Sequence, residues 1–176
     1  MRNARPLSVL LAALLPAVVG GCGRAQAGEG PPAACQHLEV SSAEETGGQA
    51  AELFSATRTI DLTFTVKFHK GFTGDHVLEL RVLTPDGHLY RSLVTPITAD
   101  GSREPRAVPL AGHRRPVTER PLRLWGPAGQ RTVDVSFPVA GTDILSAGLY
   151  GMWRVEARLD RGRTACNLVT TFTLTE

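Results

Sequence analysis

The side chains that could do chemistry are scattered along this chain and do not form a motif. No two of its five histidines have the spacing of zinc ligands, and four of the five lie beside expected turns or strand ends. The chain has no Gly-x-Ser-x-Gly nucleophile elbow, and no cysteine has a partner histidine in such a context. We therefore expect a protein that is not an enzyme and that has no metal site and no cofactor. The histidines are His37, His69, His76, His88 and His113.

Two pairs of acidic residues could in principle serve acid–base chemistry. They are the neighbours Glu44 and Glu45, and Asp134 with Asp143. Carboxylates in a polar stretch are usually solvated, whereas a glycosidase needs its pair in a cleft. The glycine-rich stretch at 126–129 lacks the lysine and the flanking helix of a phosphate loop. These patterns do not point to a reaction.

The first 22 residues contain no acidic residue and have the pattern of a secretory signal. Arg2 and Arg5 give a basic start, and an apolar run follows over 7–19. About 20 helical residues are needed to cross a hydrocarbon core, so this run is too short to span a membrane. The run ends in Val19-Gly20-Gly21-Cys22, which is an aliphatic residue, two small residues and a cysteine.

This segment resembles the lipobox of bacterial lipoproteins. The resemblance implies a signal peptide over 1–21, a diacylglyceryl thioether on Cys22 and usually a second acylation, for instance with palmitate. Two acyl chains hold a protein stably to a bilayer. Gly23, in place of aspartate, favours the outer membrane in a two-membrane cell. The alternative is an ordinary signal peptide cleaved near Ala25-Gln26-Ala27, with an incidental cysteine.

Residues 22–34 are mostly Gly, Ala and Pro, a composition that buries no apolar surface and predicts a flexible tether. The folded domain is then expected over 35–176. The chain carries 19 basic and 17 acidic residues, and loss of Arg2 and Arg5 with the signal peptide leaves 17 of each. A neutral protein lacks the basic surplus that general nucleic-acid binding needs. We therefore expect no nucleic-acid partner.

Cys35 and Cys166 remain once Cys22 is lipidated, and an exported protein can form disulfides. A bond between them would close almost the whole folded region and stabilise it by at most roughly 4–5 kcal/mol. Two buried free thiols are the alternative. Metal binding is disfavoured because neither cysteine has a second ligand at a suitable spacing.

Alternating apolar and polar residues predict most of the strands. The clearest strand begins at Ile60 and ends at Phe68, and Pro85-Asp86-Gly87 is a turn between two others. Only Ala43 to Ser55 has a helical pattern, which Gly47 and Gly48 weaken. Seven or eight strands with so little helix predict an all-β, antiparallel sandwich. The expected strands lie near 36–40, 60–68, 77–84, 88–94, 122–125, 133–139, 153–159 and 166–174.

The stretch from Gly148 to Val155 is similar to immunoglobulin-like sandwiches, more specifically to macroglobulin-like and bacterial adhesion modules. There, a Gly-x-Tyr start and an inward aromatic residue, here Trp153, begin the penultimate strand. The resemblance implies binding or scaffolding and transfers no site. It departs from antibody domains because Cys35 precedes the first clear strand and Cys166 lies on the last. A bond between these cysteines is expected to tie the termini together without crossing the core.

A long Pro/Arg-rich loop is expected from Asp100 to Arg123. Proline at this density predicts that the segment does not pair into strands. Because arginine suits bidentate contact with carboxylates or phosphates, we expect Arg114, Arg115 and Arg120 to contribute to docking. A solvated loop with local ion pairs is the alternative. The arginines of the segment are Arg103, Arg106, Arg114, Arg115, Arg120 and Arg123.

These patterns together favour a non-catalytic, lipid-anchored cell-envelope protein. Its sandwich would bind or scaffold another envelope component, such as a pilus, secretion or surface-polymer assembly. The alternative is a lipid-anchored hydrolase or carbohydrate-active protein acting on wall or polysaccharide. A soluble-ligand or inhibitor module is a third possibility.

Overall fold

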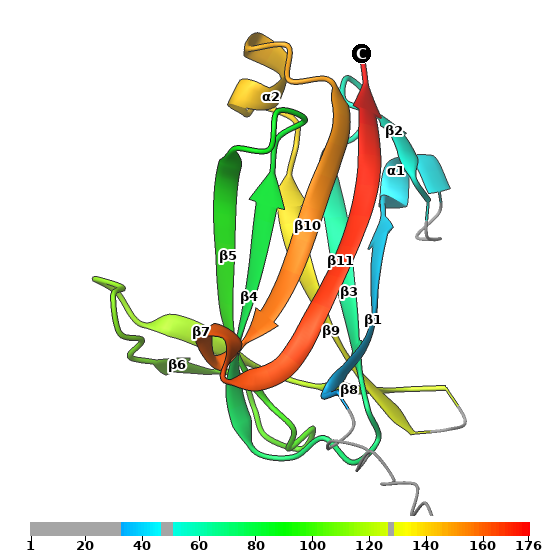
Figure 1. The fold of residues 1–176 in the computed structure, drawn as a ribbon. Coiled ribbons are helices and arrows are strands. Elements are labelled where there is room, and N and C mark those ends of the chain that lie inside the picture. Colours follow the sequence, from blue (N-terminus) through cyan, green and yellow to red (C-terminus); the bar gives the residue numbers. More distant parts are fainter. Residues whose placement is uncertain (1–32, 47–50, 127–128) are drawn as a thin grey trace, which may run out of the picture. The chain divides into compact units, whose positions relative to one another are not determined.

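The computed structural model describes residues 33–46, 51–126 and 129–176, and these residues form a sandwich of two β-sheets (Figure 1). One sheet has the strand order β1-β3-β9-β8, and the other has the order β2-β11-β10-β4-β5-β7-β6. Neighbouring strands run antiparallel except β2 beside β11 and β7 beside β5. The two packed sheets confirm the predicted all-β sandwich.

The strands of both sheets come from all parts of the described chain. The first sheet consists of β1 (Cys35–Ser41), β3 (Asp61–Phe68), β9 (Gln130–Pro138) and β8 (Arg123–Trp125). The second consists of β2 (Leu53–Ser55), β11 (Thr164–Thr175), β10 (Gly151–Leu159), β4 (Asp75–Leu83), β5 (Leu89–Thr98), β7 (Val117–Pro121) and β6 (Arg106–Val108). The helical segments of the described residues are α1 (Ala43–Thr46), α2 (Asp143–Ser146) and the 3-10 turn η1 (Asp160–Gly162).

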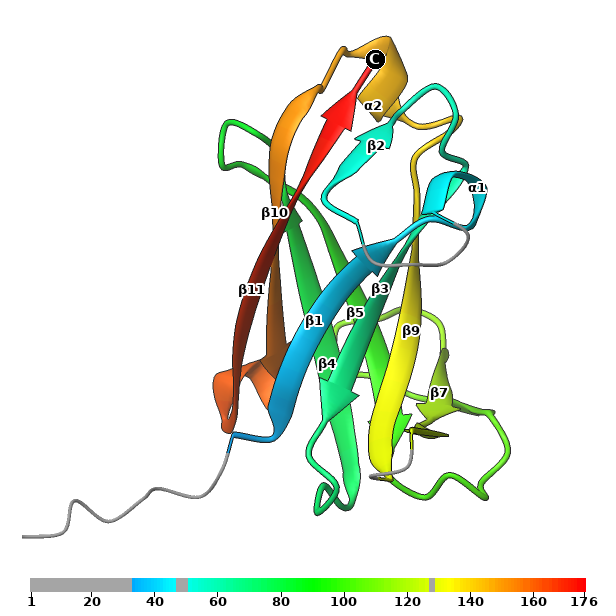
Figure 2. The same ribbon diagram turned by 90° about the vertical axis from the view of Figure 1, so that its right-hand side faces the viewer.

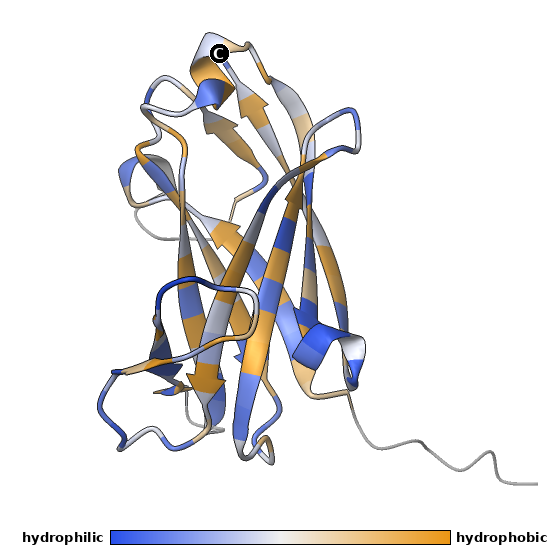
Figure 3. Cartoon of the chain, turned by 90° about the vertical axis from the view of Figure 1, so that its left-hand side faces the viewer, coloured by the Kyte–Doolittle hydropathy of each residue, from blue (hydrophilic) through white to orange (hydrophobic). Residues whose placement is uncertain are grey.

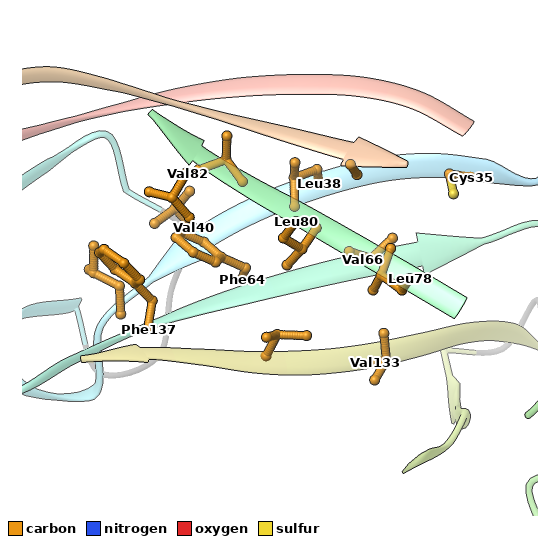
Figure 4. Close-up of a cluster of buried hydrophobic side chains, with 14 of the residues drawn as sticks. Cys35, Leu38, Val40, Phe64, Val66, Leu78, Leu80, Val82, Val133 and Phe137 are labelled. Atoms are coloured by element: carbon orange, nitrogen blue, oxygen red, sulfur yellow. The ribbon is translucent and has the colours of Figure 1, made fainter. Parts of the chain in front are cut away.

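Alternation along the strands places one set of side chains between the sheets. In β3 every second residue from Leu62 to Phe68 is buried, and hydrophobic and hydrophilic residues alternate along the strands in Figure 3. Apolar side chains of β3 and β9 meet those of β4 in the core (Figure 4). Burial of such side chains contributes about 1.5–3 kcal/mol each and drives the two sheets together.

Aromatic rings fill one part of the core. Trp153 of β10 is fully buried, stacks on Phe172 at a centroid distance of 6.1 Å and meets the ring of Tyr90 edge-on at 5.2 Å. Its indole nitrogen donates a hydrogen bond to the Leu149 carbonyl at 3.0 Å. This bond satisfies the one polar atom of the side chain, so the ring is buried without an orphaned donor. Trp153 thus points into the core, as expected for the aromatic residue of this strand.

Cys35 and Cys166 form the predicted disulfide, with Cα atoms 5.0 Å apart. The bond joins β1 of the first sheet to β11 of the second, and both cysteines are buried in the core. The expectation that it would tie the two termini together is wrong for the C-terminus, which lies ten residues after Cys166. Cys166 lies near the start of β11, and that long strand carries the C-terminus to the other end of the sandwich (Figure 1).

All eight expected strands are present, and three further strands appear where none was expected. Two of them, β6 and β7, lie inside the Pro/Arg-rich segment and pair with each other, so the prediction of an unpaired loop is wrong there. The prolines flank these strands and do not interrupt them. A strand end tolerates proline because no ladder bond is lost there. The prolines are Pro105 and Pro109 around β6, Pro116 before β7 and Pro121 at its end.

Two further expectations need correction. Among the described residues of the stretch from Ala43 to Ser55, α1 is helical and the last three residues form β2, which pairs in parallel with the end of β11. Ile60, expected on the buried face of a strand, is 59% exposed because β3 begins one residue later, at Asp61.

The predicted signal peptide, the lipobox with Cys22 and most of the tether lie outside the described residues. The lipid anchor therefore stays a prediction. Among the residues that the structure does describe, no helix is both long and apolar enough to cross a membrane.

Candidate functional site

A groove of about 770 Å³ lies where the chain passes from one sheet to the other. One wall is β7, which lies beside the edge strand β6 in the second sheet, and the opposite wall is formed by β8 and β9 of the first. Leu122, which is buried between β7 and β8, closes its floor. The Pro/Arg-rich segment thus provides most of the groove. Its lining includes Arg120, Arg123, Arg131, Asp134, Pro105 and Leu124.

Asp134 of β9 connects the two walls of the groove. The Arg120 guanidinium donates a hydrogen bond to the Asp134 carbonyl at 3.1 Å. The Arg123 guanidinium lies 3.6 Å from the Asp134 carboxylate, which also accepts a 2.8 Å hydrogen bond from the Thr65 hydroxyl. These contacts occupy only part of the five donors on each guanidinium, and the Arg123 side chain is 80% exposed. Both arginines therefore retain donors for a ligand.

Arg131 is a groove residue that the sequence analysis did not select. Its guanidinium donates to the carbonyl of Phe72, in the turn between β3 and β4. The signal was present in the alternation of the strand predicted at 133–139, once that strand is extended two residues toward the N-terminus. Arg131 is in phase with Val133 and Val135, which face the core, so a cation stood at an inward position. A cation at an inward position needs a hydrogen-bond partner or an opening to solvent, and Arg131 has both, the Phe72 carbonyl and the groove.

The other face of β7 carries an ion-pair cluster, which we define as Asp75, Arg103, Arg106 and Glu119. Glu119 is buried, and Arg106 binds its carboxylate through two nitrogens, at 2.8 and 3.4 Å. Arg103 reaches both Glu119, at 3.5 Å, and Asp75, at 3.0 Å. Hydrogen bonds from Thr98 and Arg103 hold the pKa of the Asp75 carboxyl below its usual value. This cluster fixes β7 and β6 against β4, and so positions the groove wall.

Arg114 and Arg115 lie away from Arg120, so the structure does not bring the three predicted docking residues into one site. The first two are exposed in the connection between β6 and β7, next to the turn in which His113 N donates to the Leu110 carbonyl. Within the described part of the chain, neither makes a hydrogen bond or an ion pair. That connection borders a second hollow of about 320 Å³, lined also by Arg161 and Arg163. A docking role for Arg114 and Arg115 remains a prediction.

One histidine and one acid that the sequence did not pair meet at the β10–β11 turn. His76 Nδ1 lies 2.7 Å from an Asp160 carboxylate oxygen, which also accepts from the Thr164 hydroxyl at 2.6 Å. Burial alone would raise the pKa of Asp160, but these bonds and one from the Val77 backbone lower it below its usual value. Asp160 and Arg161 both have positive φ, so the carboxylate helps to hold a strained turn.

The remaining candidates for chemistry stay apart. Asp134 lies on β9, whereas Asp143 begins α2 at the other end of the sandwich (Figure 1). Glu44 accepts a 2.6 Å hydrogen bond from Ser42, and this bond lowers the pKa of its carboxyl. In the described ranges no group of three or more His, Cys, Asp or Glu side chains is placed to hold a metal ion. The groove is therefore the site with the clearest binding chemistry.

The groove combines cationic hydrogen-bond donors with apolar walls. Guanidinium groups bind carboxylates and phosphates through paired N–H donors. Leu124 and the neighbouring prolines add apolar surface beside them. Asp134 disfavours a ligand whose negative charge approaches β9 directly. A ligand that fits has an acidic group at the rim and an apolar group on the floor.

No family model matches this chain, and no curated protein matches it. Among solved structures, the chain is similar to an immunoglobulin-like protein from Pseudomonas aeruginosa. The TM-score is 0.34 and the sequence identity 15%, over 81% of this chain and 95% of the other. The β-sandwich described above follows from the two sheets of this chain, independently of that likeness.

Proposed function

We propose that this protein is a non-catalytic binding module of the cell envelope, which docks through the arginine-lined groove onto an acidic segment of a protein partner. A lipid on Cys22 would hold it to the membrane. The observation that carries the proposal is the convergence of Arg120, Arg123 and Arg131 on one open groove. The outer membrane and an envelope assembly as partner are the finer parts of the proposal, and they rest on the lipobox resemblance alone.

An extended polypeptide segment suits the groove better than a compact ligand. The lining comes from β7 on one side and from β8 and β9 on the other, so a segment laid between them would contact residues of all three strands. Successive side chains of an extended segment point to opposite sides. Such a segment could place acidic residues against Arg120 and Arg123 while its apolar residues cover Leu124.

The pairing of these arginines within the protein favours specific binding over general attraction to anions. Because Arg120 already donates to the Asp134 carbonyl, its guanidinium is held in place before a ligand arrives. Preorganised donors lose less conformational entropy on binding than mobile ones. The association should still weaken with salt, because these arginines contact the ligand at the protein surface, where salt screens their charge.

A site-specific photo-crosslinker at Leu124, in the full chain in its own cells, tests the proposal. Leu124 lines the groove and is 75% exposed. We expect one discrete protein adduct, whose peptide at the crosslink is acidic. Arg120→Ser with Arg123→Ser should remove the adduct, and Arg131 stays unchanged because its bond to Phe72 supports the fold.

The matched control places the crosslinker at Met152, which is 65% exposed but lies on β10 of the second sheet. This position should give no such adduct. Equal adducts at both positions, or an adduct at Leu124 that persists in the double variant at low salt, would overturn the groove as the docking site.

A further inference from the structure

Trp125 is an exposed tryptophan in the described part of the chain. The chain has two tryptophans, and the other, Trp153, is fully buried in the core. Trp125 is 57% exposed. It alternates with Leu124 on β8, so Leu124 faces the groove whereas Trp125 lies on the outer face of the first sheet. There the Lys67 ammonium sits 5.8 Å from the centre of its ring.

The register of the first sheet places Trp125 at the end where the chain enters the domain. Cys35 pairs with Phe68, Phe68 with Arg131, and Arg131 with Leu124, so these residues form one row across the four strands. Neighbouring strands are about 4.8 Å apart, and the row therefore spans about 14 Å.

Trp125 lies one residue farther toward that end of the sheet, where it pairs with Gln130. On the opposite side of the sheet, Ala34 is likewise one residue beyond the row, and its carbonyl accepts from the His69 N–H at 3.0 Å. Figures 1 and 2 show β8 and the start of β1 at the same end of the sandwich. Trp125 and the first described residues are thus at one end.

We propose that Trp125 contacts the headgroup region of the bilayer to which Cys22 is anchored, an inference that rests on the lipid anchor of the proposed function. Residues 23–34 have the composition of a flexible tether, with an average span of about 20 Å. Such a short connection gives the nearby end of the domain an effective concentration at the membrane on the order of millimolar. At that effective concentration, even a weak contact between the domain and the bilayer is populated.

Tryptophan is the side chain best suited to this contact. Its ring is apolar and its indole N–H is polar, so it settles at the boundary between headgroups and acyl chains. The adjacent charge is already balanced, because the Lys67 ammonium forms a 2.6 Å ion pair with Glu39. The contact is therefore mainly apolar and persists at high salt, whereas docking in the groove weakens with salt. Leu124, which lines the groove, and Trp125 lie on opposite faces of β8.

Quenching of tryptophan fluorescence by lipids with brominated acyl chains tests the inference. The full chain is processed and lipidated in cells, purified, and reconstituted into vesicles of phosphatidylcholine with a minor fraction of phosphatidylglycerol. We expect brominated lipid to remove most of the exposed tryptophan's emission, at low and at high salt. Trp125→Phe should abolish the quenching, because Trp153 is buried.

A matched control moves the exposed tryptophan to the other end of the sandwich. Leu53 of β2 is 63% exposed and pairs beside the C-terminal end of β11. In the variant Trp125→Phe, Leu53→Trp, the new indole should escape quenching. Vesicle-bound protein with an unquenched Trp125, or with equal quenching at both positions, would overturn the inference while leaving the anchor intact. Protein that does not bind vesicles at all would overturn the anchor, and the inference with it.

Discussion

The arginines on either side of Pro109 in the Pro/Arg-rich segment differ in what they contact. Before it, Arg103 and Arg106 are bound to the buried carboxylate of Glu119 and to Asp75. After it, Arg114 and Arg115 are exposed and make no ion pair within the described residues. The composition of the two stretches is similar, but one maintains the fold and the other is free to contact a partner. The difference lies in the acidic residues that the topology brings alongside.

Removing Arg103 and Arg106 together should have the largest effect on stability. Arg103→Ala with Arg106→Ala leaves the Glu119 carboxylate buried and unpaired, and loss of a buried charge partner costs about 3 kcal/mol or more. The free energy of unfolding, measured by urea denaturation, should fall by about that amount. Adding Glu119→Gln should recover part of the loss, because it removes the unpaired charge. A loss that the third substitution leaves unchanged would show that charge burial is not the cause.

Acid should destabilise the protein through the same region. The pKa of Asp75 and that of Asp100 lie below their usual value of 3.8, the first through hydrogen bonds from Thr98 and Arg103, the second through those from Ser102. A lowered folded-state pKa stabilises fully above the unfolded value, and this stabilisation is lost as pH falls through the folded value. The urea midpoint should therefore drop below about pH 4. In Arg103→Ala the drop should be shallower, and an equally steep drop would contradict the assignment.

Arg120→Ser should have a smaller effect on stability. It removes one hydrogen bond to the Asp134 carbonyl, and a typical bond of this kind contributes about 1 kcal/mol. Because the site is exposed, water can replace the guanidinium. Thermal denaturation should show a small decrease in the midpoint, whereas crosslinking from Leu124 should decrease strongly. A variant that loses several kcal/mol would mean that Arg120 serves the fold more than the site.

Arg114→Ser with Arg115→Ser should change stability least, by about 0.5 kcal/mol or less, because neither side chain has a partner among the described residues to lose. Capture of the partner should weaken only if the β6–β7 connection is part of the interface, and the weakening should then vanish at high salt. The matched comparison is Arg103→Ala with Arg106→Ala, which has the same change in charge. Equal destabilisation by the two pairs would erase the distinction between the stretches.

The alternation of apolar residues predicted the sandwich well, because burial between two sheets imposes a period of two on each strand. It missed β2, β6 and β7 because they are only three to five residues long, too short to show a clear alternation. The ion-pair cluster was equally hidden, since Asp75 and Glu119 are far apart in sequence. Arg131 is different. Its inward phase was visible once the strand predicted at 133–139 is extended two residues toward the N-terminus, and that phase marks the groove wall.

The disulfide also bears on how the domain responds to force. Tension applied through residue 34 would otherwise peel β1 from β3 one hydrogen bond at a time, starting at Cys35. Because Cys35 is bonded to Cys166, the pull passes at once to β11 and thus to both sheets. Strands must then separate together, which raises the barrier that governs forced unfolding. A domain held at one end by its chain and at the groove by a partner could carry load between them while remaining folded.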